Sequence, residues 1–470
     1  MFFYKTKLII SSIILILTII YYQVYEYFFF PKKLNYEKQV SKTIDQINNI
    51  NGILNRKTAD IGTIFRDNIK VNKGFSMDNL NGIININEKE KWVEVGGKTR
   101  FYDVLNYTLK YNLMPKIVPE FNSITVGGAI SGVSIESSSF KYGWVHDTII
   151  DMDILLSSGE LLYCTRDNEN KDLFNAIPNS YGTIGYVTKA KLELVESKSY
   201  VKVVNTKFSS SDDLFKKMKE EVNKKDADFI EAVAYKKNEL YLSLGYLTNE
   251  KEKFLPLSKY PSDGIYFKSI RNKRYNFLTL YDYYWRWDSD MFWGADDVEI
   301  LKSRWLRKFV GRFVLNTRFL RCCQKVIKNF SNKNSKKEII IQDLGIPHEN
   351  ADKFYNWICE TINDYPIWIC PVVPKKSDTY FWKYNDSSLY YDIGLFGFIK
   401  ENKEKYYYNK LIESKLIELG GNKCFYSDTF FSKNEFDNFI DPKKYEEIKL
   451  KYDTSKKLQQ LYDKVVNKIC

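Results

Sequence analysis

The chain has 470 residues, of which 44% are hydrophobic and 28% are charged, an ordinary balance for a globular protein with room for two or three domains. Its seven cysteines form no C-x-x-C pair, and only His146 and His348 could join them, so no metal site is expected. The net charge of +12 is local, because residues 302–337 carry twelve basic side chains and no acidic one. A nucleic-acid binder, whose basic surface usually covers a whole domain, is therefore disfavoured.

An apolar segment opens the chain. Residues 8–30 form a run of 23 whose only charged member is Glu26, close to the roughly 20 residues that cross a bilayer as a helix. A cleavable signal peptide is the alternative, but no small-x-small site follows the apolar core. We interpret residues 1–33 as a single-pass membrane anchor. The unpaired cysteines favour a body, residues 34–470, that faces the cytosol.

The patterns after the anchor indicate an α+β fold. Residues 34–54 are typical of an amphipathic helix, and a helical pattern over 101–109 ends before Pro115. Strands are expected at residues 82–87, 91–95, 147–156, 161–164 and 186–195. A composition shift near residues 197–200 separates a first domain, 34–198, from a second domain, 199–470, that is rich in aromatic residues.

One stretch is unusually rich in small residues. TVGGAISGVSIESSSFKYG, residues 125–143, has four glycines and five serines among nineteen residues. Glycines let backbone N–H groups approach a ligand and permit positive φ, and serine hydroxyls can donate to phosphate oxygens. A flexible polar linker, the alternative, would not alternate small residues with residues such as Val126, Ile130 and Val133. The stretch therefore predicts a loop that binds a phosphate-bearing cofactor.

A second glycine pair is a weaker candidate. Gly96-Gly97-Lys98-Thr99 follows a predicted strand and ends like a phosphate-binding P-loop, but Trp92 stands where that motif needs its first glycine. We interpret it as a turn between a strand and a helix.

The longer motifs carry a family resemblance. MPKIVPEFNSITVGGAISGVSIESSSFKYG, followed by a strand pair around SSGE and by LFNAIPNSYGTIGYVTKAKLELV, resembles the FAD-binding domain of the vanillyl-alcohol-oxidase flavoproteins. The V-G-G loop joined to I-E-S-S-S-x-K-Y-G most resembles the delta-24 sterol reductases of the Diminuto group. YYWRWDSDMFW, YPIWICP and YDIG extend the similarity over most of the chain from about residue 35.

The resemblance implies a two-subdomain PCMH-type FAD-binding domain over 34–198 and an α+β substrate (cap) domain over 199–470. It implies that FAD is wrapped by Thr125, Val126, Gly127, Gly128, Ala129, Ile130, Ser131, Gly132, Val133, Ser134, Ile135, Glu136, Ser137 and Ser138. Lys141, Tyr142 and Gly143 would close this loop, and Gly182, Thr183, Ile184 and Gly185 would contact the flavin-adenine side. The family's first phosphate loop survives here at best as residues 73–76. No histidine stands at an attachment position, which implies noncovalent FAD, and His146 is interpreted as a surface or turn residue.

The implied reaction is reduction of a carbon–carbon double bond, in a sterol side chain, with NADPH as electron donor, at the endoplasmic reticulum. Such a reduction needs a hydride from the flavin and a proton from a nearby acid. We take Tyr284 or Tyr391 as candidates for that acid, and Arg286 as a partner of reduced flavin or of the nicotinamide phosphate. The alternative is that these aromatic residues belong to the core.

Residues 302–337 are interpreted as a membrane-facing segment. On a helical wheel over 304–314, one half holds Trp305, Leu306, Phe309, Val310, Phe313 and Val314, and the other holds Arg304, Arg307, Lys308 and Arg312. This pattern is typical of a helix that lies in an anionic membrane surface. The alternative is a helix packed on its own domain with a solvated basic face.

Together these inferences predict a membrane-anchored FAD oxidoreductase whose partners are the bilayer and a lipophilic sterol. Two alternatives remain open at this point. One is an FAD-linked oxidase or dehydrogenase of another substrate, such as a sugar lactone. The other is a degenerate flavoprotein that acts as a membrane-bound binding protein.

Overall fold

The computed structural model of the protein describes residues 17, 21, 31–56, 74–290, 292–293, 303–317, 338–375, 379–384, 388–399 and 403–468. The predicted anchor, residues 8–30, lies almost wholly outside this set. Within the described residues, no helix combines the length and the apolarity that crossing a membrane requires. The described elements form the mixed α/β structure that the patterns predict.

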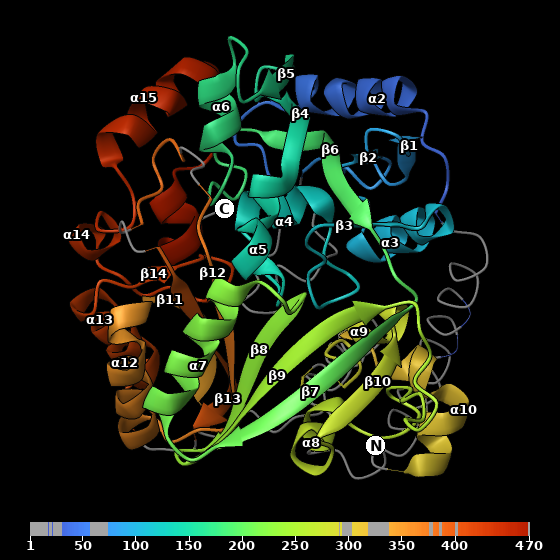
Figure 1. Ribbon diagram of the computed structural model, residues 1–470. Helices are drawn as coiled ribbons and strands as arrows, with labels where there is room; N and C mark the ends of the chain where they lie inside the picture. Colours follow the sequence, from blue (N-terminus) through green and yellow to red (C-terminus); the bar gives the residue numbers. More distant parts are fainter. Residues whose placement is uncertain are drawn as a thin grey trace, which may run out of the picture.

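The first sheet is antiparallel and lies at the top of the view in Figure 1. Its strands run in the order β1-β2-β6-β4-β5, with β3 also paired to β6. They span β1 Ile83–Asn87, β2 Trp92–Gly96, β3 Leu113–Pro115, β4 Ile149–Leu155, β5 Leu161–Thr165 and β6 Tyr186–Glu196. In β6, Thr188, Ala190 and Leu192 are buried while Lys189 and Lys191 are half-buried, so the alternation in the sequence marks the core face correctly.

The helices around this sheet are α2 Tyr36–Asn48, α3 Phe101–Thr108, α4 Val126–Gly132, α5 Ser139–Tyr142 and α6 Lys171–Ala176. The α2 helix begins where the Asn35 side chain accepts a hydrogen bond from the backbone N–H of Lys38. Its residues Tyr36, Val40 and Ile47 are buried, at the spacing of one helical face. It ends at Asn48, earlier than the predicted residue 54, shortly before Gly52 with its φ of +98°.

The second sheet is also antiparallel and has the order β10-β7-β9-β8-β12-β13-β11-β14. Its strands are β7 Tyr200–Phe208, β8 Phe229–Lys236, β9 Glu239–Thr248, β10 Tyr275–Thr279, β11 Glu338–Pro347, β12 Ile367–Val372, β13 Tyr390–Ile399 and β14 Asn422–Lys423. The helices of this part of the chain are α7 Ser211–Lys224, α8 Tyr266–Asn272, α9 Leu280–Tyr284, α10 Arg304–Val314, α12 His348–Thr361, α13 Tyr407–Glu418, α14 Lys433–Phe436 and α15 Pro442–Tyr452. Helices α7 and α12 pack together on one side of this sheet (Figure 1).

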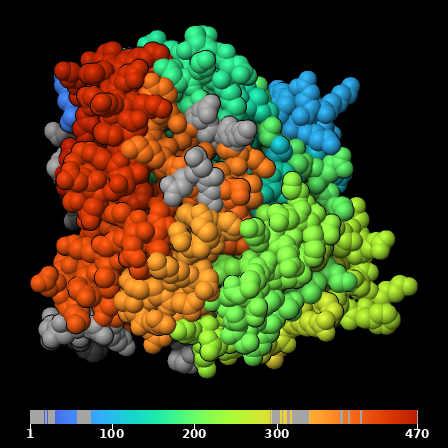
Figure 2. Space-filling model, turned by 60° about the vertical axis from the view of Figure 1, so that its left-hand side comes forward, coloured from blue at the N-terminus to red at the C-terminus, as the bar shows by residue number. Residues whose placement is uncertain are grey.

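The C-terminal segment returns to the first sheet. Helix α15 packs beside α6, where Lys451 pairs with Asp172 at 2.5 Å, and Lys449 donates a hydrogen bond to the carbonyl of Thr183. Figures 1 and 2 both show this red segment next to the blue-green part of the chain. Leu458 belongs to the same buried cluster as Leu155 and Tyr186, so the C-terminal segment packs against residues of the predicted first domain.

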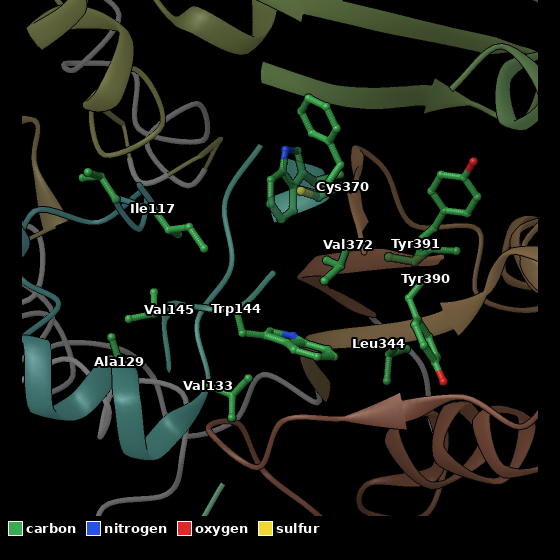
Figure 3. Packing of buried hydrophobic residues seen from close by; sticks show 14 of the residues in the cluster. Ile117, Ala129, Val133, Trp144, Val145, Leu344, Cys370, Val372, Tyr390 and Tyr391 are labelled. Atoms are coloured by element: carbon green, nitrogen blue, oxygen red, sulfur yellow. The ribbon is translucent and has the colours of Figure 1, made fainter. Parts of the chain in front are cut away.

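The two halves share one hydrophobic core. Ala129, Val133 and Trp144 from the first half and Val372 from β12 belong to the same buried cluster (Figure 3). The backbone N–H of Ile230 in β8 donates to the carbonyl of Ser137, which ties the second sheet to the serine-rich stretch. This contact places the stretch against β8 and β12, and the main cavity opens beside it.

Candidate active site

A cavity of about 410 Å³ lies between the two sheets. One wall comes from the connections of the first sheet and the other from β11, β12 and β13. The volume is in the range of small-molecule and cofactor sites, and both walls combine apolar surface with a few polar groups. We therefore take this cavity as the functional site.

The predicted glycine loop is a helix. Residues Val126–Gly132 form α4, whose Val126, Ala129 and Ile130 are buried in the core. Its other face lines the cavity with Gly127, Gly128 and Ser131. None of its glycines has positive φ, so the expected reason for them was wrong in part. They permit close packing instead, since a Cβ at Gly127 would lie 2.9 Å from the carbonyl oxygen of Gly97.

The predicted cofactor residues divide into two groups. Those that line the cavity are Thr125, Gly127, Gly128, Ser131, Gly132, Val133, Ser134, Ile135, Gly182 and Gly185. Those outside its lining are Val126, Ala129, Ile130, Glu136, Ser137, Ser138, Lys141, Tyr142, Gly143, Thr183 and Ile184. Residues of the second group make contacts elsewhere in the protein. Ile184 is buried in the core, Lys141 forms an ion pair with Asp228, and Glu136 forms an ion pair with Arg286.

Two cations that sequence reasoning missed line the same wall. Lys98 follows Gly97, so the segment interpreted only as a turn also contributes to the cavity. Arg56 is half-buried there, and desolvation lowers the pKa of its guanidinium. Asp78, the carboxylate that acts on Arg56, already lies 3.4 Å from the Lys98 ammonium. The wall therefore holds more positive than negative charge and suits an anionic ligand.

The opposite wall is aromatic and acidic. Its rings come from Phe292, Trp293, Trp368, Trp382, Tyr384, Tyr390, Phe396 and Tyr426, and Phe121 and Trp144 of the first wall pack against Phe292 and Trp382. The carboxyls of Asp343 and Asp392 lie among these rings, and Glu120 of the first wall lines the same cavity. An aromatic wall favours binding of a flat apolar ligand. The same rings shield the carboxyl groups from water, which disfavours their charged form.

The two aspartates form a pair across neighbouring strands. Asp343 in β11 lies opposite Gly394 in β13, and Asp392 lies opposite Gly345, so the two side chains share one face of the sheet. A Cβ at Gly394 would come within 2.8 Å of an Asp343 carboxylate oxygen, so the glycine leaves room for this acid. Tyr426 donates a hydrogen bond to Asp343 at 2.5 Å.

Burial raises the pKa of all three acids. It raises the pKa of Asp343 to about 6, although the Tyr426 hydrogen bond and Lys423 act against it. The pKa of Asp392 is raised further, by burial and then by the charge of Asp343, and its Oδ2 has no hydrogen-bond partner among the residues that the structure describes. Burial, and then the neighbouring Glu136, also raises the pKa of Glu120 well above its ordinary value. Asp392 and Glu120 are therefore the proton donors of the cavity at neutral pH, whereas Asp343 is mostly ionised.

The structure places none of the predicted catalytic residues in the lining of the cavity. The Tyr284 hydroxyl is buried against the sulfur of Met114, at 3.4 Å. Tyr391 donates to the carbonyl of Phe215 at 3.1 Å, and Figure 3 shows it on the opposite side of β13 from Tyr390, which does line the cavity. This packing disfavours a direct catalytic role for either tyrosine.

Arg286 belongs to a buried ionic cluster. Its guanidinium lies 2.9 Å from Glu231 and 3.2 Å from Glu136, and it stacks 3.8 Å from the centre of the Tyr283 ring. The indole N–H groups of Trp287 and Trp368 donate to the same oxygen of Glu231. Glu136, the glutamate of the I-E-S-S-S motif, thus forms an ion pair with Arg286. The guanidinium of Arg286 binds these two glutamates and lies outside the cavity lining.

His146 also lies outside the cavity lining, in the short 3-10 helix Val145–Thr148, but it is not at the surface. It is buried, with its ring stacked on Trp144, and burial lowers its pKa to about 4. Within the described residues, no group of acids, histidines and cysteines is arranged to hold a metal ion.

Comparison with known proteins gives this cavity a chemical context. Residues 63–165 match a family described as an FAD binding domain. The chain is an FAD-dependent oxidoreductase. It is 26% identical to the Delta(24)-sterol reductase of Homo sapiens over 415 residues, which cover 83% of this chain and 77% of that protein. It is 25% identical to the Delta(24)-sterol reductase of Arabidopsis thaliana, over 79% of this chain and 72% of that protein. Cytokinin dehydrogenase 7 of Oryza sativa is 30% identical over 118 residues, which cover 25% of this chain and 22% of that protein.

The cavity of this oxidoreductase fits FAD. Arg56 and Lys98 offer cations to a pyrophosphate, and Ser131 and Ser134 offer hydroxyl donors nearby. The glycine face of α4 leaves the backbone of the wall accessible to a long dinucleotide. The flavin ring would then face the aromatic and acidic wall, since both walls belong to one cavity.

Replacing Arg56 with Gln is expected to weaken FAD binding by about tenfold or more, because a hydrogen bond to a charged group contributes about 1.5–3 kcal/mol. The measurement is titration of the apoprotein with FAD, followed by flavin fluorescence. Arg274→Gln, which removes an exposed cation outside the cavity lining, is the matched control and should leave the affinity unchanged. Equal FAD affinities for Arg56→Gln and the unaltered protein would contradict the assignment.

Proposed function

We propose that this oxidoreductase reduces a carbon–carbon double bond in the side chain of a sterol, with NADPH as the electron donor and FAD bound noncovalently. The observation that carries the proposal is the pairing, in one cavity, of a wall suited to FAD with an aromatic wall that holds the protonated carboxyl of Asp392. A hydride alone leaves a carbanion-like carbon, so an alkene reductase needs an acid in an otherwise apolar site.

The similarity to Delta(24)-sterol reductases supports the same reaction class. Because those relatives are named sterol reductases, a sterol is the first substrate to test. A flat hydrocarbon with one double bond also suits rings such as Phe121, Phe292 and Phe396, which form an apolar cluster at the cavity.

In this proposal, different residues of the chain bind the cofactor and supply the proton. When bound, reduced FAD supplies the hydride. Arg56 and Lys98 would hold the phosphates of FAD, and the aromatic wall excludes water from the double bond. Asp392 gives its proton to the second alkene carbon, because its acid form is favoured and its Oδ2 accepts no hydrogen bond within the described part of the chain. Asp343, which Tyr426 orients, lies beside Asp392 and keeps that acid protonated.

The N-terminal segment completes the proposal. Residues 8–30 have the length and apolarity of a membrane anchor, and such an anchor would keep the enzyme beside a substrate that dissolves in lipid. By its resemblance to sterol reductases, the membrane is that of the endoplasmic reticulum, with the body in the cytosol.

Membranes that carry the protein are expected to saturate a sterol with an unsaturated side chain when NADPH is supplied. Gas chromatography of the extracted sterols measures the product, and membranes without the protein are the control. Turnover that needs oxygen but not NADPH would instead identify an oxidase, the class of activity left open by the match to a cytokinin dehydrogenase over 118 residues. Purified protein that binds no FAD would favour a binding protein.

A further inference from the structure

Helix α10 carries an exposed aromatic pair. Trp305 is 71% exposed and Phe309 is 61% exposed, and their ring centres are 4.9 Å apart. Arg304 and Lys308 are exposed beside them, one residue before each ring. These four residues, the α10 face, combine apolar rings with positive charge on one side of a helix that lies at the periphery of the molecule (Figure 1).

The inner side of α10 is anchored by an ion pair. Arg307 is 1% exposed, and its guanidinium makes two hydrogen bonds to Asp290, at 2.6 and 3.0 Å. Gly311 is buried, and a Cβ there would lie 3.1 Å from Pro261. The helical wheel grouped Arg307 with Arg304 and Lys308 on the basic half of the helix, but Arg307 is buried and only the other two are exposed. The helix already packs on its own protein through this side, so the exposed rings are not needed to hold it there.

The end of α10 is joined to the cavity wall. After the helix, Thr317 donates to Asp288 at 2.5 Å, and the same carboxylate accepts from the backbone N–H of Asn122. The Thr317 hydroxyl also lies 3.2 Å from that of Ser123, which lines the cavity. The segment after α10 is thus in contact, through Thr317, with Ser123 in the lining of the cavity.

We propose that the α10 face docks on the anionic surface of a lipid bilayer. Exposed tryptophan and phenylalanine insert at the level of the headgroups, while flanking Arg and Lys pair with anionic lipids. The sequence around the helix strengthens the charge argument, since residues 302–337 carry twelve basic side chains and no acidic one. The contact adds a second membrane attachment to the predicted anchor, and it does not depend on the proposed reaction.

The test uses the full chain in nanodiscs that contain phosphatidylcholine, phosphatidylserine and a trace of a photoactivatable phospholipid. After illumination, mass spectrometry maps the residues that are joined to lipid. We expect adducts on the peptide that contains Trp305 and Phe309. The Trp305→Ser/Phe309→Ser variant should lose at least nine-tenths of them, and replacing phosphatidylserine with phosphatidylcholine should reduce them several-fold.

Phe254 provides the matched control. It is 93% exposed, but it lies among both acidic and basic residues, Glu250, Lys251, Glu252 and Lys253. Its peptide should carry no adducts, and Phe254→Ser should leave the α10 adducts unchanged. The proposal is overturned if the α10 peptide is no more labelled than the Phe254 peptide, or if it is joined to a second copy of the chain instead of lipid.

Discussion

Replacing Asp392 with Asn is expected to leave FAD bound and reducible by NADPH, and to slow the transfer from reduced flavin to the alkene by about 100-fold or more. General acids contribute about 10²–10⁴-fold to such steps, and the amide is nearly isosteric but cannot give a proton. Stopped-flow absorbance of the reduced enzyme, mixed anaerobically with substrate, measures this step apart from flavin reduction.

The same assignment predicts the direction in which the rate of transfer to the alkene changes with pH. Burial and the nearby Asp343 raise the pKa of Asp392, so its acid form is present at low and neutral pH and is lost as the pH rises through that pKa. The titratable groups around Asp392 include Asp343, Glu120, Tyr426, Lys423, Cys370 and Cys424. Transfer should therefore fall at high pH, and Asp392→Asn should remove that fall.

Asp364→Asn is the matched control for Asp392→Asn. Burial raises the pKa of Asp364 to about 6, yet this residue lies outside the cavity lining. Its replacement should not change the transfer rate or its pH profile. If Asp392→Asn transfers at the normal rate while Glu120→Gln does not, the proton comes from Glu120 and the assignment to Asp392 is wrong.

Replacing Arg286 with Ala is expected to destabilise the protein by about 3–5 kcal/mol, a loss that can prevent folding, because it leaves a buried charge uncompensated. Glu231 and Glu136 would remain buried without their cation. Glu231 would still accept hydrogen bonds from the indole N–H groups of Trp287 and Trp368, but these donors are neutral and do not balance its charge. Chemical denaturation followed by tryptophan fluorescence measures the free energy of unfolding.

Arg271→Ala is the comparison, because Arg271 pairs with Glu239 while 43% exposed and should cost less than about 1 kcal/mol. A second variant, Arg286→Lys, keeps the charge and should recover part of the stability. If Arg286→Ala is instead as stable as the unaltered protein, binds FAD and is not reduced by NADPH, then Arg286 acts in electron transfer, as the sequence alone suggested.

The FAD wall was the part of the site most open to sequence reasoning. Eight of its residues lie between Thr125 and Ile135, so a single motif locates this part of the lining, whereas Arg56 and Lys98 lie outside that motif. What the motif could not show was that Val126–Gly132 is a short helix. Seven residues that include three glycines give a weak helical pattern, and the segment is held by contacts to the distant backbone of Gly97.

The acidic wall could not be found in this way. Asp343 and Asp392 are brought together only by the register of β11 and β13, which no local pattern specifies. The motif YDIG did point to the correct strand, but Tyr391 was chosen in place of its neighbour. Every residue from Tyr390 to Leu395 is buried, so the sequence does not distinguish the face at the cavity from the face against α7.

For helix α10, the sequence alone could not separate buried cations from exposed ones. A helical wheel treats all cations as solvated, and it placed Arg307 with Arg304 and Lys308 on one exposed face. The partner of Arg307 is Asp290, seventeen positions earlier and fully buried. A buried ion pair of this kind depends on tertiary packing, so only the structure separates the inner cation from the outer ones.

The visible spectrum of the purified protein tests the central claim most directly. The oxidised protein should show the absorbance bands of FAD, and anaerobic NADPH should bleach them. Adding a sterol with an unsaturated side chain, without oxygen, should then restore the bands in proportion to the saturated sterol formed. If NADPH bleaches the flavin but no such sterol restores it, the flavoprotein assignment stands and the proposed reaction is contradicted.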